Sequence, residues 1–341
     1  MNKKVLILPA VLLGLGLASC KRSNTVDQTI TVVSSKGLAA VALAGQISLN
    51  TYTFANDNAL ASVEISRNGK DVVVCDAVTG LNELVKNTNK NYGLTKVVSY
   101  NQDRLVKLNA SLPDAPTSDH VVVSYGKGTA GDKAFRKMYK EPTAYVSTAK
   151  DVLNLLKTGE YKEQTIDYVV IDAATYDVAK KDVATYQAAT NSEVVAILAE
   201  KWAEYTEAAP NVEQQKNIPG LVTFVSKGAA DQKATGLEGF YTTLAIGVKN
   251  AVEKVENTTT AIKAYSSKAE QQIEMFGATA EAIETVQANN ANGLGLLATE
   301  QPADIASYMA KFLEASFIGE TTETHSTLKH IQVAISQNNN N

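Results

Sequence analysis

The sequence is poor in the residues that build metal centres and disulfides. It holds three histidines and two cysteines among 341 residues. His325 and His330 lie near the C-terminus, and two histidines make a poor zinc site, so we expect no metal and no other cofactor. If Cys20 is modified as described below, Cys75 is the remaining thiol, and an intrachain disulfide is excluded.

An excess of basic residues is also lacking. The chain has 32 Lys and Arg against 36 Asp and Glu, a net charge of −4. Loss of residues 1–19 would remove Lys3 and Lys4 and no acids, which leaves 30 basic residues against 36 acidic ones, a net charge of −6. Such a surface has no basic patch to hold nucleic acid, so we expect no nucleic-acid partner.

Motifs for hydrolysis are missing as well. The sequence contains no Gly-x-Ser-x-Gly and no His-Glu-x-x-His. A nucleophile needs a base within reach, and none of the loops singled out below contains a histidine. We therefore expect a protein that is not an enzyme.

Long apolar runs are absent except at the N-terminus. The run from Val5 to Leu17 follows two lysines and is too short to span a bilayer comfortably, so residues 1–19 are predicted to be a signal peptide. The sequence "LASC" at 17–20 resembles the lipobox of bacterial lipoproteins, which implies lipidation of Cys20; the alternative is an ordinary signal peptide cut nearby. Residues 20–27 are predicted to be a tether and 336–341 a disordered tail.

Strands and helices alternate along the chain in two units. β-branched or apolar runs at 29–34 and 71–75, and again at 121–124 and 166–171, are typical of buried strands, and each is followed by a helical pattern. The proline-containing segment from Leu108 to Asp119 is predicted to be a crossing between units. We expect an α/β fold of two lobes, with two open and mostly parallel sheets flanked by helices. Residues 28–110 and 221–335 are assigned to one lobe and 111–220 to the other.

The two units end a strand in the same way. "VVVCDAVTGL" begins at Val72 and "YVVIDAATYD" at Tyr168. Ligands of open α/β sheets bind beyond the carboxyl ends of the strands. Four loops meet this condition, at 34–37, 76–79, 124–129 and 172–175, and each precedes a helix with free N–H groups. If the lobes face each other, these loops line one cleft.

Asp76 and Asp172 are the sharpest candidates in these loops. Each carboxylate could accept hydrogen bonds from a ligand amine or hydroxyl, or could cap the helix that follows; the two roles are compatible. Lys36 could pair with an anionic group or lie on the surface, and Tyr125 could stack on a ligand. The other candidates are Ser34, Ser35, Tyr52, Ala77, Thr79, Gly126, Gly128, Thr129 and Thr175. Trp202 and Cys75 are expected in the core.

Together these features resemble a type II periplasmic binding protein, the substrate-binding lipoprotein of an ABC importer. The resemblance rests on "TITVVSSKGLAAVALA", "DVVVCDAVTGLNELVKN", "VVVSYGKGTAGDKAFRKMY", "IDYVVIDAAT" and "IPGLVTFVSKGAAD", and is strongest to the group that binds sulfonates, nitrate, taurine or thiamine precursors. One departure is that no arginine occurs in the four loops, although arginine commonly binds such anions.

The resemblance implies a monomer, lipid-anchored on the extracytoplasmic face of the cell membrane. Such a protein captures a small polar or anionic organic solute by hinge closure and delivers it to an ABC permease with its ATPase. The alternative is a surface lipoprotein that mediates protein contacts and has no transported ligand.

Overall fold

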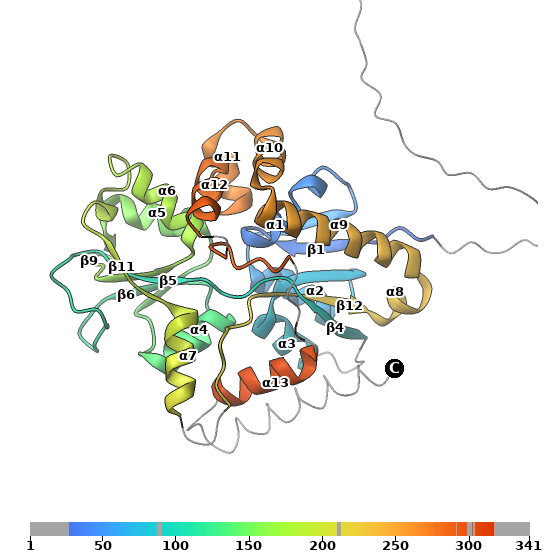
Figure 1. Cartoon of the computed structure of the whole chain (residues 1–341), viewed down its shortest axis with the longest axis horizontal. Helices are drawn as coiled ribbons and strands as arrows, with labels where there is room; N and C mark the ends of the chain where they lie inside the picture. The colour runs from blue at the N-terminus through green and yellow to red at the C-terminus, as the bar shows by residue number, and fades with distance from the viewer. Residues whose placement is uncertain are drawn as a thin grey trace, which may run out of the picture.

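The chain forms two lobes, each built on a five-stranded sheet (Figure 1). The computed structural model describes residues 27–86, 91–209, 213–290, 292–298, 302 and 304–316. Cys20, the predicted signal peptide, His325, His330 and the predicted tail lie outside these residues. Trp202 and Cys75 have no exposed surface, which confirms that both belong to the core.

The first sheet has the strand order β2-β1-β3-β12-β4. β1 pairs in parallel with β2 and β3, whereas β12 pairs antiparallel with β3 and β4. β1 and β3 are buried along their whole length, as expected for strands that begin with runs of valine in a parallel sheet. The strands are β1 (Val32–Ser35), β2 (Tyr52–Ala55), β3 (Val72–Asp76), β4 (Tyr92–Val97) and β12 (Leu221–Ser226).

The second sheet has the order β11-β5-β10-β6-β7. β6 pairs in parallel with β7 and β10, whereas β5 pairs antiparallel with β10 and β11. Both sheets are therefore mixed. In each lobe one strand runs antiparallel to its neighbours, and this strand, β5 or β12, is the first that the chain forms after crossing from the other lobe. The strands are β5 (Arg104–Lys107), β6 (Val122–Tyr125), β7 (Ala144–Val146), β10 (Tyr168–Ile171) and β11 (Glu193–Ile197).

Helices cover both sheets. Those of the first lobe are α1 (Leu38–Ala42), α2 (Asn58–Arg67), α3 (Ala77–Lys86), α8 (Lys227–Gln232) and α9 (Ala234–Glu253). Those of the second are α4 (Ala130–Met138), α5 (Ala149–Thr158), α6 (Ala173–Lys181) and α7 (Leu198–Ala208). The C-terminal helices are α10 (Val255–Tyr265), α11 (Ala269–Phe276), α12 (Ala280–Asn289) and α13 (Ile305–Ser316). Short elements are η1 (Ala44–Gln46), η2 (Gln187–Ala189) and the hairpin β8 (Glu160–Tyr161) and β9 (Gln164–Thr165).

The chain crosses between the lobes earlier than the sequence indicated. β5 pairs within the second sheet, so the first crossing lies at 98–103. The segment from Leu108 to Asp119 is instead a loop of the second lobe, where Tyr168 donates a hydrogen bond to the Pro113 carbonyl at 2.6 Å. Its prolines therefore belong to a loop within one lobe. The crossing at 98–103 is fixed by backbone hydrogen bonds to distant segments and contains no proline.

Three segments run side by side at the crossing. The Gly220 N–H donates to the Ser99 carbonyl at 2.9 Å, and the Tyr100 N–H donates to the Gly295 carbonyl at 2.8 Å. Gly295 has φ +69°, and a Cβ there would lie 2.2 Å from the Tyr100 carbonyl oxygen, so a side chain is excluded. We call residues 98–103, 217–221 and 292–298 the hinge.

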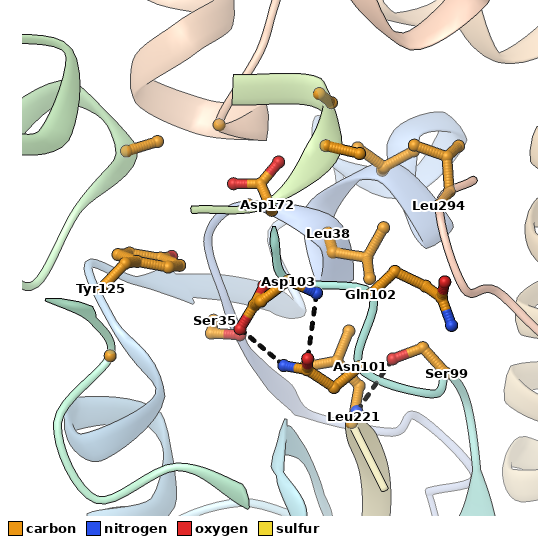
Figure 2. A pocket seen from close by; sticks show the side chains of 18 of the residues that line it. Ser35, Leu38, Ser99, Asn101, Gln102, Asp103, Tyr125, Asp172, Leu221 and Leu294 are labelled. Atoms are coloured by element: carbon orange, nitrogen blue, oxygen red, sulfur yellow. Dashed lines mark hydrogen bonds between the residues drawn. The ribbon is translucent and has the colours of Figure 1, made fainter. Parts of the chain in front are cut away.

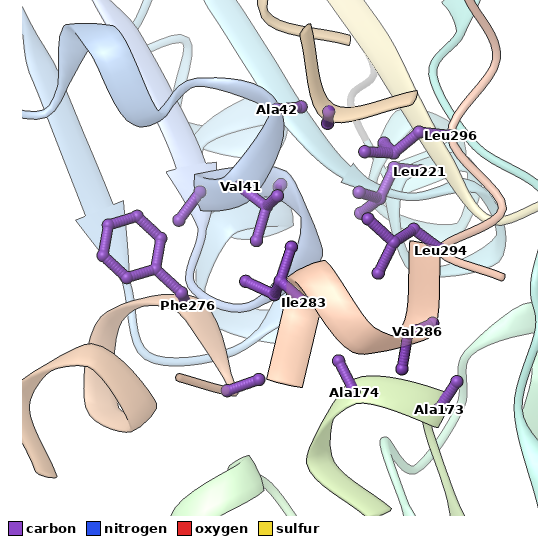
Figure 3. Packing of buried hydrophobic residues seen from close by; sticks show 14 of the residues in the cluster. Val41, Ala42, Ala173, Ala174, Leu221, Phe276, Ile283, Val286, Leu294 and Leu296 are labelled. Carbon is purple, nitrogen blue, oxygen red and sulfur yellow. The ribbon is translucent and has the colours of Figure 1, made fainter. Parts of the chain in front are cut away.

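The C-terminal helices join the lobes on both sides of the hinge. α11 and α12 pack against α5 and α6 of the second lobe, and α11 also packs against α1 of the first (Figure 1). Figure 3 shows Ala173 and Ala174 of α6 close to Ile283 and Val286 of α12, within an apolar cluster that includes residues of both lobes. α13 packs against β4 and α4 on the other side. The structure is therefore that of a closed molecule.

Replacement of Phe312 by alanine tests the α13 contact. The Phe312 ring is fully buried, with its centroid 5.6 Å from that of Trp202 in α7. We expect F312A to lower the free energy of unfolding by about 3–5 kcal/mol, since a buried aromatic ring is lost. Trp202 is the only tryptophan, so denaturant unfolding followed by its fluorescence measures the effect. I246A, at a 55% exposed site, is the control; equal losses in the two variants would contradict the α13 packing.

Candidate functional site

A cavity of about 120 Å³ lies between the lobes, beside the hinge (Figure 2). Its walls come from the carboxyl ends of strands in both sheets, from the hinge and from the C-terminal helices. The polar lining includes Ser35, Asn58, Asp76, Ser99, Asn101, Gln102, Asp103, Tyr125 and Asp172. The apolar lining includes Leu38, Val41, Leu221, Phe276, Ile283 and Leu294. The prediction that loops from separate lobes line one space is thus met in the structure.

The predicted site residues divide into two groups. Those that line the cavity are Ser35, Lys36, Asp76, Tyr125, Gly126, Thr129 and Asp172. Those that do not are Ser34, Tyr52, Ala77, Thr79, Gly128 and Thr175. The residues of the first group have atoms that face the cavity. Several of the second group instead make hydrogen bonds that stabilise the loops around it.

Tyr52 does not reach the cavity because of its place in its strand. It is the first residue of β2 and pairs with Val32, at the end of the sheet opposite the cavity. Ser34 is fully buried within β1, and its hydroxyl donates to the carbonyl of Ser35. The Ala77 N–H donates to the Gly220 carbonyl at 2.9 Å, and the Gly128 N–H donates to Asp132 at 2.8 Å. These hydrogen bonds stabilise the cavity walls without facing the cavity.

Asp76 joins the two lobes. Its Oδ1 accepts hydrogen bonds from the N–H groups of Val78 at 2.9 Å and Thr79 at 3.1 Å, which caps α3. The same carboxylate accepts from the N–H of Ala130, the first residue of α4 in the second lobe, at 3.1 and 3.2 Å. One side chain therefore binds the N-termini of two helices that belong to different lobes.

Burial governs the charge of Asp76. The residue is 5% exposed, and desolvation raises its pKa to about 7, although the three backbone donors act in the opposite direction. The negative charge of Asp103 raises the pKa further. Near neutral pH the carboxyl group is consequently divided between its charged and neutral forms.

Asp172 makes the equivalent cap in the second lobe. It accepts from the N–H of Thr175 at 2.9 Å, and the Thr175 hydroxyl lies within hydrogen-bond distance of both the Asp172 carboxylate and the Gly277 carbonyl. Gly277 ends α11, so this threonine also connects α6 to the C-terminal helices. Burial raises the pKa of Asp172, while hydrogen bonds from Thr175 and the charge of Arg104 lower it.

The sequence analysis missed the residues that the hinge contributes. Asn101 donates to Asp103 Oδ2 at 2.6 Å and accepts from the Asp103 N–H at 3.0 Å. Burial, reinforced by the charge of Asp172 and opposed by Asn101, raises the pKa of Asp103 to about 7. The polar run "NQD" between two strands is the available signal, but without knowledge of the crossing it reads as an ordinary turn.

Ser35 and Tyr125 complete the polar wall. Ser35 is 1% exposed, and its hydroxyl has no hydrogen-bond partner among the described residues. Figure 2 shows Ser35, Asp103, Asp172 and Tyr125 around one space. Burial, together with the charges of Asp172 and Asp103, raises the pKa of the Tyr125 phenol, so this hydroxyl stays protonated and can donate a hydrogen bond.

Lys36 lines the cavity but is engaged elsewhere. Its ammonium group lies 3.4 Å from the Glu274 carboxylate of α11. No arginine lines the cavity among the residues that the structure describes. In the same part of the chain, no group of three or more His, Cys, Asp or Glu side chains is placed to hold a metal ion.

No family model and no curated protein matches this sequence, but solved structures resemble the model. An ABC transporter protein from Parabacteroides distasonis is 13% identical with a TM-score of 0.57, over 87% of this chain and 95% of that one. The alkanesulfonate-binding protein SsuA of Xanthomonas axonopodis, bound to MOPS, is 9% identical with a TM-score of 0.57, over 91% and 97% of the two chains. The periplasmic nitrate-binding protein NrtA of Synechocystis is 11% identical with a TM-score of 0.53, over 93% and 90%.

The fold is that of a type II periplasmic binding protein. The resemblance and the two-lobed α/β architecture predicted from the sequence are thereby confirmed. Two of these neighbours are binding proteins, one for alkanesulfonates and one for nitrate, and identities this low carry the likeness of fold alone. Within the described residues, no helix combines the length and apolarity needed to cross a bilayer.

Replacement of Asp76 by alanine tests the bond between the lobes. The variant leaves three N–H groups without their acceptor, so we expect the free energy of unfolding to fall by about 2–4 kcal/mol. D57A is the matched control, because Asp57 caps α2 through the Leu60 N–H at 2.7 Å within one lobe; its expected loss is about 1 kcal/mol. Equal losses measured by denaturant titration would show that the Ala130 contact adds nothing.

Replacement of Asp103 by asparagine tests the buried carboxyl group in the hinge. The folded state raises the pKa of Asp103 from 3.8 to about 7. Between pH 4 and pH 7 the carboxyl group therefore tends to keep its proton in the folded protein and to lose it in the unfolded chain. This group therefore favours folding below pH 4, and its contribution is lost as pH rises to 7. We expect the stability of D103N relative to wild type to increase between pH 4 and pH 8, measured by thermal unfolding. The exposed D231N should show no such trend.

Proposed function

We propose that the protein is the extracytoplasmic solute-binding component of an ABC import system. The observation that supports this function best is the cavity at the hinge, where strand ends of both sheets meet. Open α/β sheets bind ligands at this edge, and a site between two lobes can bury nearly all of a small solute. The neighbours of similar fold point to the same role.

Capture in this proposal proceeds by closure about the hinge. Backbone hydrogen bonds between residues 98–103 and the two other hinge segments keep the axis in place while the lobes separate. Contacts such as the one between Asp76 and Ala130 form only when the lobes meet. A solute that binds both walls favours the closed state, and its differential affinity for that state drives the closure.

The protein is proposed to act at the cell surface as a monomer. Cys20 would carry the lipid that holds it on the extracytoplasmic face of the membrane, and the preceding 19 residues would be removed as a signal peptide. Two or more acyl chains are needed for stable anchoring. The partners would be an ABC permease and its ATPase, which receive the solute when the lobes open.

A solute screen by thermal shift tests this function. A ligand present at 100 times its Kd stabilises the folded state by about 2.7 kcal/mol, so one chemical class of solutes should raise Tm while others have no effect. A174L, which fills the cavity from α6, should lose the response, whereas A184L, at an exposed site of the same lobe, should keep it. A surface protein that only contacts other proteins would respond to no solute, and that result would refute the proposal.

A further inference from the structure

The positive ends of the helices at the cavity are already occupied. Asp76 accepts hydrogen bonds from N–H groups in the first turns of both α3 and α4, and Asp172 accepts one from the N–H of Thr175 in the first turn of α6. The cavity also borders the starts of α2 and α5, which Asp57 and Thr148 cap through their side chains, and the start of α1, a helix of five residues. Most of the helix starts at the cavity are therefore capped by the protein's own side chains, three of them by aspartate.

The charge of the lining points the same way. Asp76, Asp103 and Asp172 contribute three carboxyl groups, and each of the last two raises the pKa of a neighbouring acid. The single lysine of the lining, Lys36, is paired with Glu274. Arg104 influences Asp172 but does not line the cavity. An added anion would meet repulsion, and among the described residues of the lining no unpaired cation offsets it.

Unused hydrogen-bonding capacity lies in the same wall. Within the described part of the chain, Ser35 Oγ is buried without a hydrogen-bond partner, and such a hydroxyl is costly unless a ligand satisfies it. Asp103 Oδ1 accepts no hydrogen bond from the described residues, since Asn101 takes only Oδ2. The Tyr125 ring faces the same space (Figure 2) and provides the aromatic surface to which cations are attracted.

We propose that the solute is a small organic cation, an amine whose ammonium group lies between Asp103 and Asp172 against Tyr125 and donates a hydrogen bond to Ser35. Its apolar part would contact Leu38 and Leu294, which face the same cavity. At about 120 Å³ the space is smaller than the roughly 300–1,000 Å³ of sites for drug-sized ligands, so the solute is small. This inference rests on the proposed function and names its substrate class.

Three probes of one chain length test the charge. Butylammonium, 1-butanol and butanesulfonate are titrated into the full-length protein at constant ionic strength, with Tm and calorimetric binding as readouts. We expect butylammonium to raise Tm and to bind at least about tenfold more tightly than the alcohol, with no response to the sulfonate. Binding should release protons from Asp103 and its neighbours Asp172 and Asp76, so the measured heat should depend on the buffer's ionisation enthalpy.

Two substitutions assign the effect to residues. D103N should weaken butylammonium binding about tenfold and reduce the proton release, whereas D231N should change neither. S35A removes the orphaned hydroxyl, so we expect it to keep or raise the Tm of the free protein while weakening the amine several-fold. Unchanged amine affinity in both D103N and S35A would overturn the proposed site.

The outcomes separate the two proposals. Preference for butanesulfonate or butanol would refute the cation and leave the solute-binding function intact. A Tm increase with another solute class in the wider screen, and none with amines, would likewise refute the cation and leave the solute-binding function intact. Failure of every solute to shift Tm would refute both proposals together.

Discussion

The closed arrangement of this molecule depends on one buried carboxylate shared between lobes. Asp76 caps α3 in its own lobe and accepts from Ala130 at the start of α4 in the other. A buried carboxylate is unfavourable unless hydrogen bonds compensate for its lost hydration, and desolvation accordingly raises the pKa of Asp76 to about 7. Backbone donors from two helices compensate for much of that cost, and they do so together only when the lobes are in contact.

The rest of the structure surrounds this contact with a hinge and two bridging groups of helices. The hinge segments fix the axis through backbone hydrogen bonds, α11 and α12 close one side over α5 and α6, and α13 closes the other beside α4 (Figure 1). The cavity is what remains between these elements. Its polar wall is acidic because Asp76 and Asp172 cap helices beside it and Asp103 reaches it from the hinge. Fold and ligand preference are thus linked: the residues that close the lobes also set the charge of the gap.

The sequence predicted the fold and the repeated strand ends because both are local patterns. A buried parallel strand shows as an apolar run, and an Asp followed by a helical pattern shows as a cap, so Asp76 and Asp172 were found with their capping role. The partner of Asp76 in α4 was not predictable, since it depends on how two lobes meet. Asn101 and Asp103 were missed for a related reason, because the hinge is defined by pairing with segments more than 100 residues away. Tyr52 was wrongly expected at the cavity, because it lies at the opposite end of its strand, paired with Val32.

The distance between the lobes tests most directly whether Asp76 holds the molecule closed. Spin labels at the exposed positions 67 in α2 and 157 in α5, in a chain with Cys20 replaced by serine, report that distance by pulsed electron resonance, while Cys75 is buried and unlabelled. The account predicts one narrow distribution in the otherwise unchanged protein and an added, longer population after Asp76→Ala. Identical distributions in the two proteins would contradict the claim that this carboxylate holds the lobes together.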